Sequence, residues 1–187
     1  GGAVSGGGTY DFNSKVTAVA VPITGYNFVG WYKDGTKISD SPTYSFTITA
    51  NTTLEARFSP NKFNIVANAT DGGEATGGGS FDYNSKATVI AKVNTGFNFL
   101  GWYENDKQVS DSPTYSFTVT SSRNLTAKFS ADKHSIVTNA TAGGTVTGAG
   151  NFDYNSNITV KATASTGYNF AGWYENGLKV SDSQTYS

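Results

Sequence analysis

The segment Gly25-Tyr-Asn-Phe-Val-Gly-Trp-Tyr32 decides the fold, because the chain contains two more versions of it. The second begins at Gly96 and reads Gly-Phe-Asn-Phe-Leu-Gly-Trp-Tyr. The third begins at Gly167 and reads Gly-Tyr-Asn-Phe-Ala-Gly-Trp-Tyr. Both steps are 71 residues long (25, 96, 167), without insertion or deletion. A period this strict over a whole chain indicates a tandem array of one structural unit.

The boundaries of the units follow from the repeat. Residues 60–130 form a complete copy, residues 1–59 form a first copy that lacks the first strand, and residues 131–187 form a third copy truncated at its C-terminal end. We therefore expect the parent chain to continue in both directions. The linkers Ser59-Pro60-Asn61 and Ser130-Ala131-Asp132 are short. Neighbouring units have little chain with which to fold back on each other, which predicts an elongated array.

Composition excludes several classes of protein. Aromatic residues make up 14% of the chain and the net charge is −1, whereas disordered chains lack aromatics and carry high net charge. The balanced charge offers no basic surface for nucleic acid. No apolar run reaches the roughly 18 residues typical of a membrane span, so we expect no membrane insertion. The absence of cysteine excludes disulfides and thiol chemistry.

Alternation of apolar and polar residues with a period of two runs through every copy and predicts strands. No segment has a sustained helical period. The predicted fold class is all-β: an elongated tandem array of small β-sandwich or β-grasp-like modules, with roughly six strands per unit. The expected inward positions are Val16, Ala18 and Ala20 in the first copy, Ala87, Val89, Ala91 and Val93 in the second, and Ile158, Val160, Ala162 and Ala164 in the third.

A second alternating stretch lies near the end of each copy. In the first copy, Tyr44, Phe46 and Ile48 alternate with small polar residues, and Leu54, Ala56 and Phe58 alternate with charged ones. The polar segment Asn51-Thr-Thr53 separates the two runs. This pattern predicts a hairpin with one apolar and one polar face.

A two-residue turn follows each tryptophan motif, at Asp34-Gly35, Asn105-Asp106 and Asn176-Gly177. Asp, Asn and Gly tolerate the positive φ that a type I′ hairpin turn needs. Counting outward from the turn places Tyr32 opposite Lys37 and Trp31 opposite Ile38. The same count pairs Trp102 with Val109 and Trp173 with Val180.

Strict alternation would place Phe28 and Trp31 on opposite faces of their strand. A β-bulge at Gly30, with counterparts at Gly101 and Gly172, would bring both rings to one face, and glycine is a common bulge residue. The predicted structural core therefore consists of aromatic side chains at six positions: Trp31, Trp102, Trp173, Phe28, Phe99 and Phe170. The tyrosine that follows each tryptophan, Tyr32, Tyr103 or Tyr174, is expected to lean outward.

The order of these motifs resembles a known family. A Gly-rich turn, an alternating strand, the Gly-Tyr-x-Phe-x-Gly-Trp box and a closing Leu-x-Ala-x-Phe strand are similar to the divergent internalin-B-type repeat, related to the Listeria–Bacteroides repeat. The resemblance covers essentially the whole chain, three times. It implies a small β-rich module of large secreted or wall-attached proteins, used as a spacer, stalk or adhesin, with no catalytic residues to transfer.

Two functions follow as hypotheses. The first is a structural stalk or fibre-forming region of an extracellular or cell-surface adhesin-like protein, which the regular spacing favours. Its partners would be copies of itself or neighbouring repeats of a longer chain. The alternative is a module that binds a host or cell-surface glycan or protein through exposed tyrosines, Tyr32, Tyr103 and Tyr174. An aligned stripe of exposed aromatic rings would favour this alternative.

Catalysis and metal binding have little support in the sequence, and we expect no enzyme activity, cofactor or metal. His134 is the only histidine, and Phe63 takes its place in the complete copy. The glycine runs near Gly6, Gly77 and Gly148 lack the Gly-Lys-Ser/Thr of a phosphate loop and are interpreted as hairpin turns. Recurring aspartates such as Asp11 and Asp40 do not form the dense cluster that calcium requires. Five Asn-x-Ser/Thr sequons would matter only in a host that glycosylates them: Asn51, Asn68, Asn124, Asn139 and Asn157.

Overall fold

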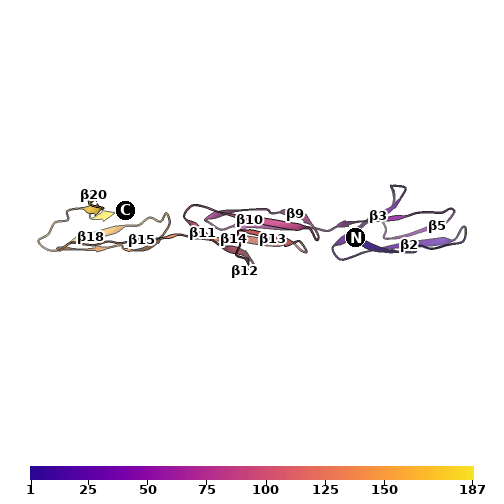
Figure 1. The fold of residues 1–187 in the computed structure, drawn as a ribbon, viewed down its shortest axis with the longest axis horizontal. Helices are drawn as coiled ribbons and strands as arrows, with labels where there is room; N and C mark the ends of the chain where they lie inside the picture. Colours follow the sequence, from indigo (N-terminus) through magenta and orange to yellow (C-terminus); the bar gives the residue numbers. More distant parts are fainter.

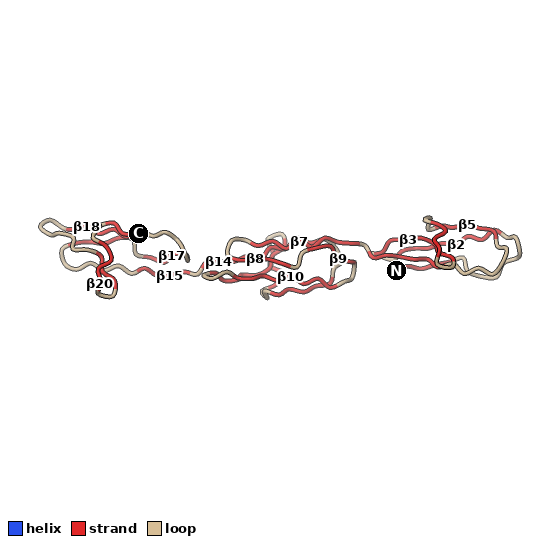
Figure 2. The backbone as a smooth tube through the Cα atoms, turned by 90° about the horizontal axis from the view of Figure 1, so that it is seen from above, coloured by secondary structure: helices blue, strands red, loops and turns tan.

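The computed structural model describes residues 1–187 and contains 21 strands and no helix. The all-β prediction is therefore confirmed. The strands form three units that lie in a row along the longest axis of the molecule (Figure 1). A view turned by 90° shows the same row, with most strands running along the long axis (Figure 2). The units contain six, eight and seven strands, against the roughly six predicted for each.

The middle unit is a sandwich of two sheets. A five-stranded sheet has the order β12-β11-β14-β7-β9, and a three-stranded sheet has the order β13-β10-β8. The eight strands are β7 (Lys62–Ala69), β8 (Gly73–Thr76), β9 (Gly79–Asp82), β10 (Lys86–Val93), β11 (Phe97–Glu104), β12 (Lys107–Ser110), β13 (Thr114–Thr118) and β14 (Arg123–Ala131).

The first unit has two three-stranded sheets with the orders β1-β2-β5 and β4-β3-β6. They correspond to the two sheets of the middle unit, since each strand has a counterpart 71 residues further on. The strands are β1 (Gly2–Ser5), β2 (Lys15–Pro22), β3 (Tyr26–Lys33), β4 (Thr36–Ser39), β5 (Thr43–Thr47) and β6 (Glu55–Pro60).

The third unit is divided into a three-stranded sheet, β16-β18-β21, and two strand pairs, β15-β17 and β19-β20. Its counterpart of β10 is shorter, and only Val160 and Ala162 are buried in it. The strands are β15 (Lys133–Ile136), β16 (Gly144–Thr147), β17 (Gly150–Asp153), β18 (Val160–Ala164), β19 (Trp173–Glu175), β20 (Leu178–Ser181) and β21 (Thr185–Tyr186).

The core of each unit lies between its two sheets. Most of the predicted inward positions point there: Val16, Ala18 and Ala20 are buried in the first unit, and Ala87, Val89 and Ala91 in the second. Val93 is 37% exposed, because it lies at the end of β10. The middle core also receives Ile65 from β7 and the alternating side chains of β14, which are Leu125, Ala127 and Phe129.

The first and last strands of the middle unit, β7 and β14, pair in parallel. Ile65 lies opposite Arg123, and Ala69 lies opposite Ala127. Because both strands run the same way, the chain enters the unit at one end and leaves it at the other. This pairing accounts for the row of units in Figure 1.

The predicted hairpin over residues 44–58 is wrong. The alternation holds, because Tyr44 and Phe46 are half-buried while their neighbours are exposed. However, β5 pairs with β2, and β6 pairs with β3 in the other sheet. The segment between β5 and β6 therefore crosses from one sheet to the other. Two strands that face one core from opposite sides show the same alternation as two paired strands, so the pattern alone does not distinguish them.

The predicted bulge is confirmed. The register between β3 and β6 shifts between Phe28 and Gly30, and β11 and β14 show the same shift before Gly101. The Phe28 and Trp31 rings then meet edge to face, with centroids 6.0 Å apart. Gly30 has a φ of +156°, and a Cβ there would come closer than 3.0 Å to the side chain of Lys37, which crosses the bulge. Glycine is required here both for its φ and for this close approach.

The turn register is only partly as predicted. Both turn residues have positive φ, 49° at Asp34 and 78° at Gly35, as a type I′ turn requires. Tyr32 does pair with Lys37, but Trp31 pairs with Ser39 rather than Ile38. Trp102 and Trp173 likewise pair with Ser110 and Ser181 rather than Val109 and Val180. A second bulge, in the strand after the turn, displaces the partner of each tryptophan by one residue.

Candidate functional site

In the first and middle units, the tryptophan lies between the two sheets. Trp31 is 2% exposed and Trp102 is fully buried. The indole N–H of Trp31 donates to the carbonyl of Pro42 at 3.2 Å, and that of Trp102 donates to the carbonyl of Pro113 at 3.1 Å. These bonds connect β3 to the turn before β5, and β11 to the turn before β13, so each bond joins the two sheets of its unit.

Trp173 differs from the other two tryptophans. It is half-buried, and its indole N–H is buried without a hydrogen-bond partner. Gln184 occupies the position of Pro42 and Pro113, and the carbonyls of all three accept equivalent backbone bonds, so only the bond from the indole is missing. Phe99 and Phe170 each pack against the tryptophan of their own unit, with ring centroids 6.4 and 5.9 Å apart.

The three tyrosines have unequal surroundings. Tyr32 and Tyr103 are half-buried, and a cation lies over each ring: Arg57 at 4.0 Å and Lys128 at 4.6 Å from the centroid. Arg57 and Lys128 are repeat counterparts, and each also pairs with a carboxylate, Glu55 or Asp106. Tyr174 is 58% exposed and has no cation over its ring. In the sequence, only the 71-residue spacing of Arg57 and Lys128 links these two cations.

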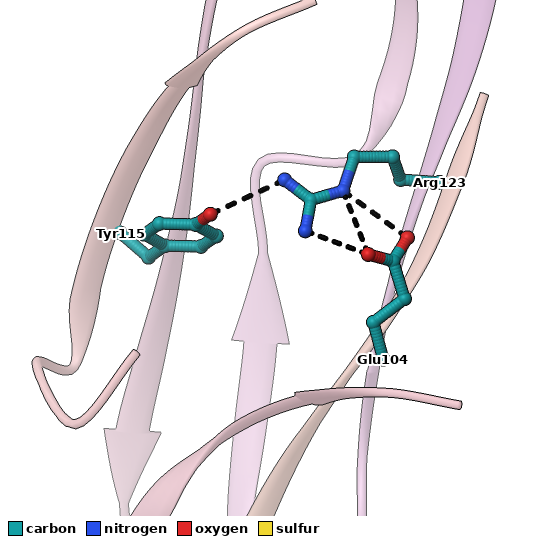
Figure 3. A network of polar contacts seen from close by, with 3 residues as sticks. All are labelled: Glu104, Tyr115 and Arg123. Atoms are coloured by element: carbon teal, nitrogen blue, oxygen red, sulfur yellow. Dashed lines mark hydrogen bonds and ion pairs between the residues drawn. The ribbon is translucent and has the colours of Figure 1, made fainter. Parts of the chain in front are cut away.

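A polar network ties the two sheets of the middle unit together (Figure 3). The Arg123 guanidinium on β14 donates to the Glu104 carboxylate on β11, with Nη2 to Oε2 at 2.7 Å. Its Nη1 donates to the Tyr115 hydroxyl on β13 of the opposite sheet at 3.2 Å. Arg123 also lies over the ring of Phe117, 4.4 Å from its centroid. The first unit has Lys33 and Thr52 at the positions of Glu104 and Arg123, so it lacks the network.

Electrostatics in this network favour the ionised forms. Hydrogen bonding from Arg123 lowers the pKa of Glu104 below its usual range, against an opposing effect of burial. The same contact raises the pKa of Arg123. Both side chains are largely covered, at 18% and 25% exposure. The network therefore connects the two sheets at a half-buried position, and its charged groups are hydrogen-bonded to one another.

Other residues singled out in the sequence do not come together. His134 is exposed on β15, where its ring lies 6.3 Å from that of Tyr154. Asp82 and Asp153 pair with Lys62 and Lys133, at 2.8 and 2.6 Å. Asp40 pairs with Lys37. No group of three or more His, Asp or Glu side chains converges on one point in the structure.

The prediction of hairpin turns is wrong for two of the three glycine runs: Gly77 and Gly148 lie where the chain passes from one sheet to another, whereas Gly6 lies in the connection between the antiparallel strands β1 and β2. Gly77 lies between β8 and β9, which belong to different sheets. Its φ is +93°, and a Cβ would come closer than 3.0 Å to the carbonyl oxygen of Thr88 on β10. Gly6 has the same contact with Thr17, and Gly148 lies against Thr159. At these three glycines the backbone passes close to the backbone of a neighbouring segment.

The five sequon asparagines are all exposed. Asn68 and Asn124 lie side by side on β7 and β14, and the Asn68 amide donates to the Asn124 carbonyl oxygen at 2.9 Å. Asn51, Asn139 and Asn157 lie outside regular strands.

Two cavities lie between the sheets of the terminal units. One, of about 380 Å³, is lined by Trp173, Phe170 and Val146 in the third unit. The other, of about 700 Å³, is lined by Trp31, Val16 and Leu54 in the first unit. In the middle unit the corresponding space holds core side chains of β7 and β14. The cavities therefore lie where core side chains are packed in the middle unit.

The comparisons with known proteins agree with this geometry. The model of the divergent InlB B-repeat domain matches three consecutive segments, residues 1–62, 63–133 and 134–187. The chain belongs to this family. The matched segments meet at 62/63 and 133/134, three residues after the boundaries expected from the repeat, 59/60 and 130/131.

A relative from Evansella cellulosilytica, named "Putative membrane protein", is 28% identical over 156 residues. The match covers 82% of this chain but only 23% of the length of the relative. The B-repeat chain itself contains no helix that could cross a membrane. No solved structure matches it.

Proposed function

We propose that this B-repeat chain is part of an extended stalk or fibre-forming region of an extracellular or cell-surface adhesin-like protein. Its role is structural, to hold other parts of the protein at a distance, and not enzymatic. The observation that carries the proposal is the parallel pairing of β7 with β14, which places the entry and exit of the unit at opposite ends. Each added repeat then adds its full length to the array.

Two further observations support a spacer. Membership of the divergent InlB B-repeat family favours a repeat region of a surface protein. The side chains that form a cluster, Glu104, Tyr115 and Arg123, are occupied with one another and bridge the sheets. Only Tyr174 among the three tyrosines is free of a cation, so the structure does not contain the aligned stripe of open aromatic rings that would favour glycan or protein binding.

The test is a display experiment on a bacterial cell surface. A small tag is separated from a membrane anchor by one, two or three repeats, and accessibility of the tag to a large antibody is measured. Accessibility should rise with each repeat. A disordered Gly-Ser linker with the same number of residues is the control, and its reach grows only with about the square root of its length. Equal accessibility for repeats and linkers would contradict the spacer function.

A further inference from the structure

The last residue of each linker, Asn61 or Asp132, forms hydrogen bonds with both of the units that it connects. The backbone N–H of Asn61 donates to the carbonyl of Gly25 at 2.8 Å, and its own carbonyl accepts from the N–H of Tyr83 at 2.7 Å. Asp132 repeats both bonds, to Gly96 at 2.8 Å and from Tyr154 at 2.7 Å. The linkers are therefore fixed on both sides by backbone hydrogen bonds.

An aromatic ring crosses each boundary beside the linker. The Tyr83 ring of the second unit meets the Tyr26 ring of the first edge to face, with centroids 6.1 Å apart. Tyr154 of the third unit meets Phe97 of the second in the same way, at 6.3 Å. Edge-to-face aromatic pairs stabilise a contact beyond the area that they bury. The same contact thus recurs at both boundaries.

The glycine that accepts the linker bond also receives this ring. A Cβ added to Gly25 would come closer than 3.0 Å to three ring atoms of Tyr83, and one added to Gly96 would meet the Tyr154 ring equally closely. Both glycines have positive φ, +83° and +81°. Any side chain at these positions would push the following unit away.

The third copy of this glycine, Gly167, provides the comparison. It has the same backbone conformation, with φ +85°, but no atom lies within 4 Å of its Cβ position. The neighbouring Tyr168 is 58% exposed. At the other end of the chain, Phe12 occupies the position of Tyr83 and Tyr154, and it is 74% exposed. Each half of the contact is thus exposed where no neighbouring unit faces it.

We propose that these residues form a specific repeat–repeat interface that holds neighbouring units in one fixed orientation. The first joint consists of Gly25, Tyr26, Asn61 and Tyr83, and the second of Gly96, Phe97, Asp132 and Tyr154. The surface at Gly167 and Tyr168 fits the same partner, a further repeat that presents an aromatic ring at the position of Tyr83. The proposal goes beyond a spacer, since units on free linkers would also act as one.

The test measures the distance between two units in the intact chain. The sequence contains no cysteine, so spin labels can be placed at Thr47→Cys and Thr118→Cys, two exposed and equivalent strand positions in the first and second units. Pulsed electron–electron double resonance between these two labels should give a single narrow distance peak. A broad distribution in the unmodified sequence would overturn the proposal.

Four substitutions then distinguish the joint from general effects on the fold. Gly25→Ala should abolish the narrow peak, because the new methyl group displaces Tyr83. Gly167→Ala imposes the same backbone strain away from any joint and should leave the peak unchanged. Tyr83→Phe keeps the ring and should also preserve it, whereas Tyr83→Ala should broaden it. Thermal unfolding verifies that the units themselves remain folded.

If Gly25→Ala and Gly167→Ala give the same narrow peak, the interface does not fix the orientation and the proposal is wrong. That result would leave the spacer function intact, because the display experiment measures reach and not stiffness. An extended chain, made by adding residues 117–187 after Ser187, tests the third surface. Gly167→Ala should then loosen the new boundary, as judged by labels on either side of it, and no effect there would contradict the assignment.

Discussion

Single residues in the middle unit carry unequal shares of its stability, and Trp102 is the clearest case. It is fully buried, and its indole N–H has a partner in Pro113. We expect Trp102→Ala to lower the free energy of unfolding by about 3–5 kcal/mol, the usual range for a buried aromatic side chain. Hydrogen exchange of the middle-unit amides measures this loss.

The matched control is Trp173→Ala. Trp173 is half-buried and its indole N–H has no partner, so its removal should cost less in the third unit. A loss at Trp102 below about 1 kcal/mol would place this side chain outside the energetic core, since buried aromatics cost several times that amount.

The Glu104–Arg123 pair predicts a pH dependence. The pKa of Glu104 is lowered by hydrogen bonding from Arg123. The pair therefore stabilises the fold fully above the unfolded-state pKa of glutamate, about 4.3, and the contribution disappears as the pH falls through the lower folded-state pKa. In urea unfolding, the stability difference between the wild type and Glu104→Gln should be constant near neutral pH and vanish in acid.

Glu55→Gln serves as the comparison for this measurement. Glu55 pairs with Arg57, but its side chain is 60% exposed, so solvent screens the pair. Near neutral pH, the stability difference between the wild type and this variant should be smaller than that for Glu104→Gln. Equal effects for the two variants would show that the half-buried position of Glu104 is not important.

Among the strands, the bulge positions are expected to require glycine. Gly101 has a φ of +144°, and a Cβ there would come closer than 3.0 Å to Gln108 and to the carbonyl of Ser110. We expect Gly101→Ala to destabilise the middle unit by about 1–3 kcal/mol, the cost typical of a strained backbone position. Chemical denaturation measures the change.

Leu100→Ala, one residue earlier in the same bulge, is the control. Leu100 is 47% exposed, so its truncation should change stability by less than about 0.5 kcal/mol. If the two substitutions had equal effects, the requirement for glycine would be refuted.

The strands also show which parts of the fold could be predicted from the sequence. Alternation identified the buried positions of β2 and β10, and the conflict between Phe28 and Trp31 identified the first bulge, because both depend only on neighbouring residues. The sheet partners of β5 and β6 could not be predicted, since strands from opposite sheets show the same alternation. The partner of Trp31 was missed because the second bulge, at Ile38, has no glycine to indicate it.

Contacts between residues far apart in the sequence were harder to predict. The parallel pairing of β7 and β14 joins segments about 60 residues apart, and no turn motif connects them. The joints were visible only as the common spacing of Gly25 and Gly96, which looked like part of the tryptophan motif. The cations over Tyr32 and Tyr103 required knowledge of which strands are adjacent.

For the whole molecule, we expect thermal stability to be independent of divalent cations. No cluster of three or more acidic or histidine side chains exists, and Asp40, Asp82 and Asp153 are paired with lysines. Adding calcium or a chelator should leave the melting temperature unchanged in differential scanning calorimetry. A rise of several degrees with calcium would point to ligation at Asp11 or Asp40.

The parallel pairing of β7 with β14 has a mechanical consequence. Tension along the array pulls β7 from its first residue and β14 from its last, in opposite directions. The hydrogen bonds between Ile65–Ala69 and Arg123–Ala127 lie across the direction of pull, so they are loaded together and not opened one after another. Stretching the array therefore loads the hydrogen bonds between β7 and β14 in shear. The first and last strands of the middle unit, which pair with each other, also bear the force.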